Sequence, residues 1–138
     1  MNPKTDWAEL FLSATGRVRQ VPFAVAAGLV LIAVAVYQST FKGGLELVIG
    51  VPFYAAALYV GACVLSKRLH DRGRSGWWAA IILLALIMAW PRPEGFFDFI
   101  AVMILVWAVV DLCIMPGERG DNRYGASLFR LRPHQQQT

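Results

Sequence analysis

The sequence predicts an all-α integral membrane protein with four transmembrane helices, a short N-terminal interfacial helix and both termini in the cytoplasm. The chain is 57% hydrophobic and 16% charged, against a charged share of roughly 25% in soluble domains. Its apolar residues form runs long enough to cross a bilayer, and its Lys and Arg residues lie mostly between these runs. At 138 residues the chain is expected to form one membrane domain, residues 1–138.

Three long apolar runs predict three of the spans. Residues 22–41 contain no charged residue, residues 45–65 contain only Glu46 near their start, and residues 95–115 carry one aspartate near each end. At about 1.5 Å rise per residue, a helix of about 20 residues matches a hydrocarbon core of about 30 Å. Each run is therefore predicted to cross the membrane.

A fourth run, residues 77–90, is shorter and is stopped by Pro91-Arg92-Pro93. Fourteen helical residues reach only about 21 Å, so this run is either a short span or a re-entrant segment. If it spans, 11 Lys and Arg residues lie on the cytoplasmic side and two, Lys42 and Arg92, lie outside. If it is re-entrant, the division becomes 8 to 5, so the positive-inside rule favours a span and a cytoplasmic tail, residues 116–138.

The residues before the first span predict an amphipathic helix over about residues 6–15. Trp7, Leu10, Phe11 and Ala14 recur at helical spacing, and Gly16 is a suitable stop. We expect this helix to lie in the cytoplasmic interface. A cleavable signal peptide is not expected, because the apolar run starts late and no small-residue cleavage site follows it.

Two polar segments fall on the same face in the four-span arrangement, so they are expected to lie close together. In residues 66–78, Gly73 would cap one helix and Ser75 would begin the next, with positive charge held inside. The alternative is an anion site made of arginines and His70. In residues 116–125, the ordinary interpretation is a turn-rich exit from the membrane.

Three motifs carry a resemblance to a known family. They are Gly16-Arg17, Arg68-Leu69-His70-Asp71-x-Gly73-Arg74-Ser75-Gly76-Trp77-Trp78, and Gly120-x-Asn122-Arg123-Tyr124-Gly125. Over about residues 7 to 125 the chain resembles the bacterial inner-membrane family catalogued as domain of unknown function 805, which includes YhaH-like proteins. The resemblance implies a multi-pass protein of the bacterial cytoplasmic membrane and no established activity. Ala126-Ser127 departs from the usual Pro-Asp.

These motifs supply a candidate polar cluster on the cytoplasmic face, for binding lipid or a partner protein. Its predicted members are Arg68, His70, Asp71, Arg74, Asn122, Arg123 and Tyr124. Two further ionisable residues fall within predicted spans. Asp111 is expected to form a structural ion pair with Arg68, Arg72 or Arg123, and Asp98 is expected to reach water near the outer end.

The residue pattern supports neither a metal or cofactor site nor a catalytic centre. The only histidines, His70 and His134, form no helical ligand pair, and Ser66 and Ser75 lack an oriented base. The two cysteines, Cys63 and Cys113, are expected to be free thiols. Nucleic acid is not an expected partner, because the positive charge lies between apolar runs.

The predicted function is a non-enzymatic inner-membrane module that binds anionic lipid or a partner through the polar cluster. The alternative is an oligomeric channel or transporter subunit affecting ion or membrane homeostasis, as a homo-oligomer or with another membrane protein. That alternative needs polar groups near mid-membrane, where the second span offers only Tyr54 and Tyr59. An enzyme acting on a lipid-linked substrate would need a reacting partner for His70, and the sequence identifies none.

Overall fold

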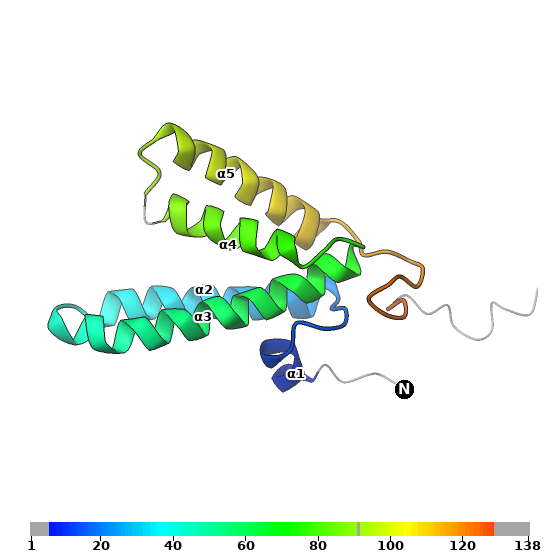
Figure 1. The fold of residues 1–138 in the computed structure, drawn as a ribbon, viewed down its shortest axis with the longest axis horizontal. Helices are drawn as coiled ribbons and strands as arrows, with labels where there is room; N and C mark the ends of the chain where they lie inside the picture. The colour runs from blue at the N-terminus through cyan, green and yellow to red at the C-terminus, as the bar shows by residue number, and fades with distance from the viewer. Residues whose placement is uncertain (1–5, 91, 129–138) are drawn as a thin grey trace, which may run out of the picture.

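The protein is a set of helices arranged as two hairpins (Figure 1). The computed structural model describes residues 6–90 and 92–128. The elements are α1 (Trp7–Leu12), α2 (Gln20–Thr40), α3 (Gly44–Asp71), α4 (Trp77–Ala89), α5 (Phe96–Val109) and the π-helical turn η1 (Val110–Ile114). Within the described residues there is no strand beyond one isolated bridge between Asn122 and Gly125, so the all-helical prediction is confirmed. Residues 129–138 of the predicted tail lie outside the described part.

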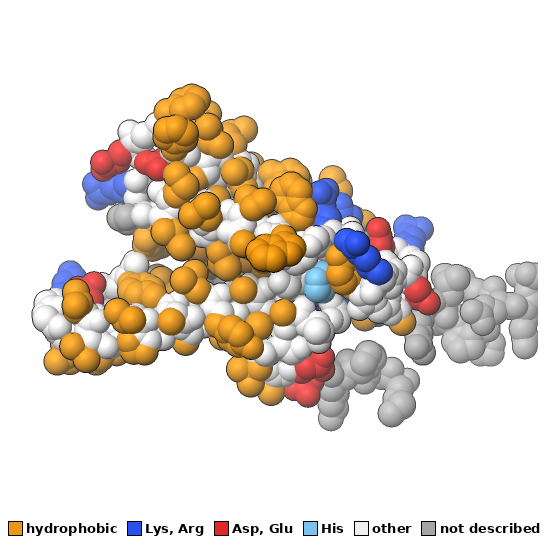
Figure 2. Space-filling model, in the orientation of Figure 1, with side chains coloured by type: hydrophobic (Ala, Val, Ile, Leu, Met, Phe, Trp, Pro, Cys, Tyr) orange, Lys and Arg blue, Asp and Glu red, His pale blue; other side chains and the backbone are white. Residues whose placement is uncertain are grey.

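Three helical segments are long and apolar enough to cross a membrane: Gln20–Thr40, Gly44–Asp71 and Phe96–Ile114. The apolar helix α4 is shorter, with 13 residues. Between 17% and 22% of the residues in the most apolar windows of the long helices are buried inside the protein. Most of their apolar surface therefore faces outward, as Figure 2 shows, and this is the surface that a membrane protein presents to lipid.

The first helix is shorter than the range 6–15 that the sequence predicts. The Asp6 carboxylate begins α1 by accepting hydrogen bonds from the backbone N–H groups of Ala8 and Glu9. The helix ends at Leu12, because the next residue, Ser13, is extended with φ −121° and ψ 136°. The Tyr59 hydroxyl of α3 donates to Leu12 O at 2.8 Å. Lys67 Nζ donates to Glu9 O at 2.8 Å, so α1 is fastened along α3.

The helix α3 continues six residues past the predicted end of its span at residue 65 and ends at Asp71. The next residues form the reversal that the sequence predicts, with Gly73 at φ +70°. The N–H of Gly73 donates to His70 O and that of Arg74 to Leu69 O, which is a Schellman motif. The N-cap of α4 is Gly76 rather than the predicted Ser75.

The two ends of this helical set differ. At the loop end, residues 13–19, 72–76 and 115–128 meet, and the main buried apolar cluster lies nearby. At the turn end, residues 41–43 join α2 to α3 and residues 90–95 join α4 to α5. There, Trp90 Nε1 donates to Gln38 Oε1 at 2.9 Å.

Candidate functional site

The loop end is organised around a buried carboxylate. Asp71, in the last turn of α3, forms ion pairs with Arg68 on the preceding turn and with Arg17 from the residues before α2. Arg17 Nε lies 2.9 Å from Asp71 Oδ1. The side chains of Arg68 and Asp71 are each 1% exposed, so this charge is held almost entirely by protein partners.

The end of η1 explains why Arg68 is buried. The last carbonyls of a helix have no partner within the helix and carry partial negative charge. Here the carbonyl oxygens of residues 112–116 all accept hydrogen bonds from side chains. Arg68 donates to residues 112 and 115, Gln20 to residues 113 and 114, and Arg72 to residue 116, at 2.6 to 2.9 Å. The helix end is therefore satisfied by protein groups.

The tail after η1 folds around Arg17. Its guanidinium donates to the carbonyl oxygens of Glu118 at 2.7 Å, Gly120 at 2.9 Å and Gly125 at 3.4 Å. The backbone N–H of Glu118 donates to Asp71 O at 2.8 Å. Residues 118–125 are therefore attached to both the start of α2 and the end of α3.

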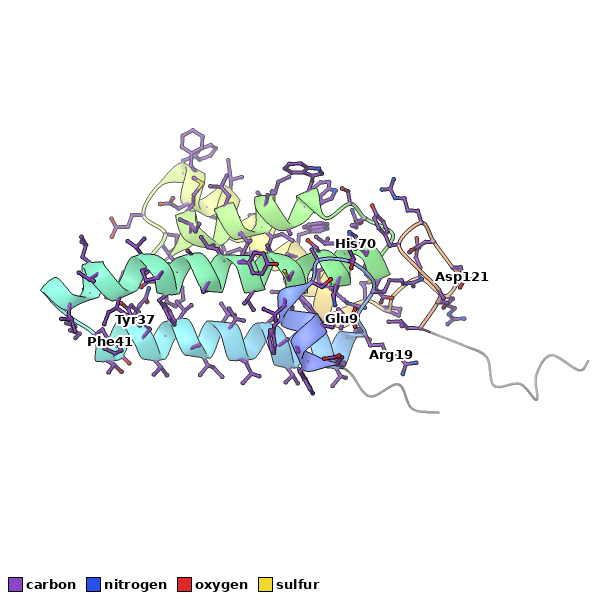
Figure 3. All side chains as sticks on the ribbon, turned by 60° about the horizontal axis from the view of Figure 1, so that its bottom comes forward. Glu9, Arg19, Tyr37, Phe41, His70 and Asp121 are labelled. Atoms are coloured by element: carbon purple, nitrogen blue, oxygen red, sulfur yellow. The ribbon has the colours of Figure 1, made fainter. Side chains whose placement is uncertain are left out.

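His70 joins the same structure through its ring. The rings of His70 and Tyr124 stack with centroids 3.9 Å apart and planes 6° from parallel, and the Arg123 guanidinium lies 4.7 Å from the Tyr124 centroid. Asn122 Nδ2 donates to His70 O at 2.9 Å. His70 Nδ1 lies 3.1 Å from Gly16 O, and since a carbonyl only accepts, Nδ1 is the donor. Figure 3 shows His70 and Asp121 at this end.

Both aspartates of the predicted spans have structural partners. Asp111, at the C-terminal part of the last span, meets Arg72 Nη2 at 2.8 Å and Arg74 Nε at 3.4 Å. Arg74 also lies 5.1 Å from the centroid of a Trp107 ring. At the other end, Asp98 accepts hydrogen bonds from the N–H groups that begin α5.

The seven residues singled out from the sequence come together at the loop end, but they divide by exposure. Arg68 and Asp71 are enclosed, whereas Arg123 is exposed and the Arg74 side chain is 37% exposed. The sequence argument missed Arg17, Gln20 and Glu118 as members, and only the Gly16-Arg17 motif pointed to one of them. In the described part of the chain, no group of three or more His, Cys, Asp or Glu residues is arranged to hold a metal ion.

Comparison with known proteins confirms the family resemblance. The family described as "Protein of unknown function (DUF805)" matches residues 9–126. The chain is 38% identical over 76 residues to the "Uncharacterized protein YiiR" of Escherichia coli K12 and to that of Escherichia coli O157:H7. Each match covers 49% of this chain and 52% of the relative, so the chain spans about half the length of these relatives. No solved structure matches the chain.

Proposed function

Because the chain belongs to the DUF805 family of proteins of unknown function, we propose its role from its own geometry, beginning with a bacterial inner-membrane protein of four spans. Two contacts support α4 as the fourth span. Gln20, which begins α2, bonds to the end of η1, and Gln38, near the end of α2, bonds to Trp90 just after α4. The hairpin of α4 and α5 thus reaches from the loop end to the turn end. Local bilayer thinning accommodates its short first helix.

The distribution of positive charge supports a cytoplasmic loop end and cytoplasmic termini. Among residues 6–90 and 92–128, eight Lys and Arg residues belong to the loop end and only Lys42 and Arg92 to the turn end. Figure 2 shows blue side chains at both ends of the molecule, with more of them at the loop end. Lys and Arg concentrate in cytoplasmic loops of bacterial membrane proteins.

We propose that the loop end binds anionic lipid headgroups without catalysing a reaction. The observation that carries this proposal is that Arg17 and Arg68 are enclosed and paired with Asp71, whereas other arginines, on the tail that folds against them, are exposed. Arg119 and Arg123 are exposed, and the Tyr124 ring is the contact that the described structure gives Arg123. Juxtamembrane arginines each contribute about 1 kcal/mol of attraction to an anionic membrane surface. Arg68 and Asp71 then serve to position the tail.

Lipid retention by the detergent-released full-length protein tests this proposal. The double variant Arg119→Gln/Arg123→Gln should retain phosphatidylglycerol about 30-fold less than wild type in native mass spectrometry, from about 1 kcal/mol per arginine. The matched control, Lys42→Gln/Arg92→Gln, removes the same charge at the turn end and should retain wild-type levels. Unchanged retention in the first variant, or equal loss in both, would contradict the proposal.

A further inference from the structure

Two carboxylates at the loop end, those of Asp71 and Asp111, each pair with two arginines, and the two groups differ in exposure. The group around Asp71 is closed: both of its guanidiniums also donate to backbone carbonyl oxygens, and both side chains are at most 2% exposed. Asp111 pairs with Arg72 and Arg74. Because one carboxylate faces two guanidiniums, each group holds one positive charge in excess.

Arg74 is the open member of the group around Asp111. Arg72 donates to Asp111 Oδ1 at 2.8 Å and to Pro116 O at 2.6 Å. The Arg74 side chain is 37% exposed, its Nε lies 3.4 Å from Asp111 Oδ2, and it makes no hydrogen bond within the described part of the chain. A guanidinium carries four N–H groups on its two Nη atoms, and those of Arg74 are therefore free to bind a group from outside the chain.

The Arg74 guanidinium is held from two sides. Its ion pair with Asp111 is one contact, and the Trp107 ring, whose centroid lies 5.1 Å from Arg74 Cζ, is the other. The Trp107 ring in turn contacts that of Trp78, with centroids 5.6 Å apart. Because these contacts fix the guanidinium in advance, a ligand loses less binding energy in ordering it.

The side chains around this guanidinium are those of a membrane interface. Trp78 is exposed, as are Val110 and Ile114, which lie within one turn of Asp111. Tryptophan gathers at the boundary between headgroups and acyl chains, and exposed apolar side chains beside it are covered by lipid. The hydrogen-bond acceptor that a bilayer presents to Arg74 at this depth is a headgroup phosphate.

We propose that Arg74, held by Asp111 and Trp107, binds the phosphate of an anionic phospholipid. The inference rests on the proposed lipid-binding function and names a defined site for it, separate from the exposed arginines of the tail. A guanidinium presents paired N–H groups that match two phosphate oxygens. The excess positive charge of the group around Asp111 favours a headgroup with net negative charge, such as phosphatidylglycerol, over a zwitterionic one.

Two substitutions of Arg74 in the full-length protein test this site by native mass spectrometry with phosphatidylglycerol. Arg74→Lys keeps the charge but removes the planar pair of donors, and we expect about a 10-fold loss of retained lipid, as for a hydrogen bond to a charged group. Arg74→Gln also removes the charge and should lose at least as much. The matched control is Arg92→Lys, the same exchange at the turn end, which should retain wild-type levels.

The outcome for Arg74→Lys decides the site. Wild-type retention by this variant, or an equal loss in Arg92→Lys, would overturn the site, because lipid would then respond to charge alone or to any such exchange. In that case, loss by Arg119→Gln/Arg123→Gln would leave the proposed function standing. Loss by Arg74→Lys with full retention by the tail variant would support the site and exclude the tail arginines as the contact. No retention by wild type would overturn both proposals.

Discussion

The loop end and the turn end of the molecule are held together by different kinds of contact. At the loop end, buried charges pair and the carbonyls that end η1 all have side-chain donors. At the turn end, the Tyr37 ring stacks on Phe53 with centroids 4.2 Å apart and on Phe41 at 5.0 Å. Figure 3 shows Tyr37 and Phe41 at the opposite end from His70.

This difference means that the two ends should respond unequally to mutation. A buried polar group that loses its partner costs more than an exposed one, because water does not replace the lost bond. Figure 1 shows the two hairpins closest at the loop end and diverging toward the turn end, where Gln38 and Trp90 provide an exposed link. We therefore expect the loop end to set the global stability.

The largest effect is expected for Arg68→Met. This change leaves the Asp71 carboxylate with one cation fewer and removes the donors to Leu112 O and Met115 O. Breaking a buried pair in this way costs about 3–5 kcal/mol in free energy of unfolding, to be measured by denaturant titration in detergent. Lys42→Met, which removes a positive charge at the turn end, is the control. If Arg68→Met lowers the free energy of unfolding no more than Lys42→Met does, Arg68 does not stabilise the loop end in the way described.

Arg17→Gln should detach the tail and lower the free energy of unfolding less than Arg68→Met does. Asp71 keeps its pair with Arg68, but the carbonyls of Glu118 and Gly120 lose their donor. We therefore expect the free energy of unfolding to fall by about 1.5–3 kcal/mol. Hydrogen exchange should accelerate at residues 118–125 while the interior of α3 stays protected. Lys42→Gln, a change at an exposed residue of the turn end, should leave exchange at 118–125 unaltered. Uniform acceleration along the chain would show that Arg17 holds more than the tail.

Gly117→Ala tests how closely the tail packs on the buried carboxylate. A Cβ at Gly117 would overlap the Asp71 carboxylate, so either the tail or the ion pairs must shift. Overpacking of this kind costs about 1–3 kcal/mol, measurable by the same titration. Gly120→Ala is the matched control, because a Cβ there meets nothing within 4 Å. If the two variants have the same free energy of unfolding, the tail does not pack against Asp71 as closely as described.

Much of the fold follows from local pattern in the sequence. Apolar runs predict the long helices, and Gly73 predicts the reversal after α3, because only a few nearby residues decide these features. The predicted role of Gly73 as a helix cap also places the end of α3 near Asp71, six residues past the predicted span, and the structure agrees. The charged last turns of α3 are neutralised by partners from distant segments, and those partners cannot be inferred from the local sequence.

The candidate site was predictable as a group of residues but not in its division of roles. Sequence pattern treats Arg68 and Arg123 alike, as positive charges on one face. Tertiary structure separates them: Arg68 is enclosed by carbonyls more than 40 residues away in the chain, whereas Arg123 is exposed. Arg17 was noted only as part of the Gly16-Arg17 motif and was not predicted as a member of the cluster, since its partner Asp71 lies 54 residues away and those in the tail 101 to 108.

The smallest effect is expected at the turn end, for Trp90→Phe. The substitution keeps an aromatic ring but removes the Nε1–H that donates to Gln38. Since this bond is exposed, its loss should cost about 0.5–1.5 kcal/mol at most in free energy of unfolding. Gln38→Leu should cost the same, and the double variant no more than either single one, because both changes remove one bond. If Trp90→Phe instead lowers the free energy of unfolding as much as Arg68→Met does, the hydrogen bond between Trp90 and Gln38 is as important as the buried ion pairs. The two hairpins would then be held together at both ends.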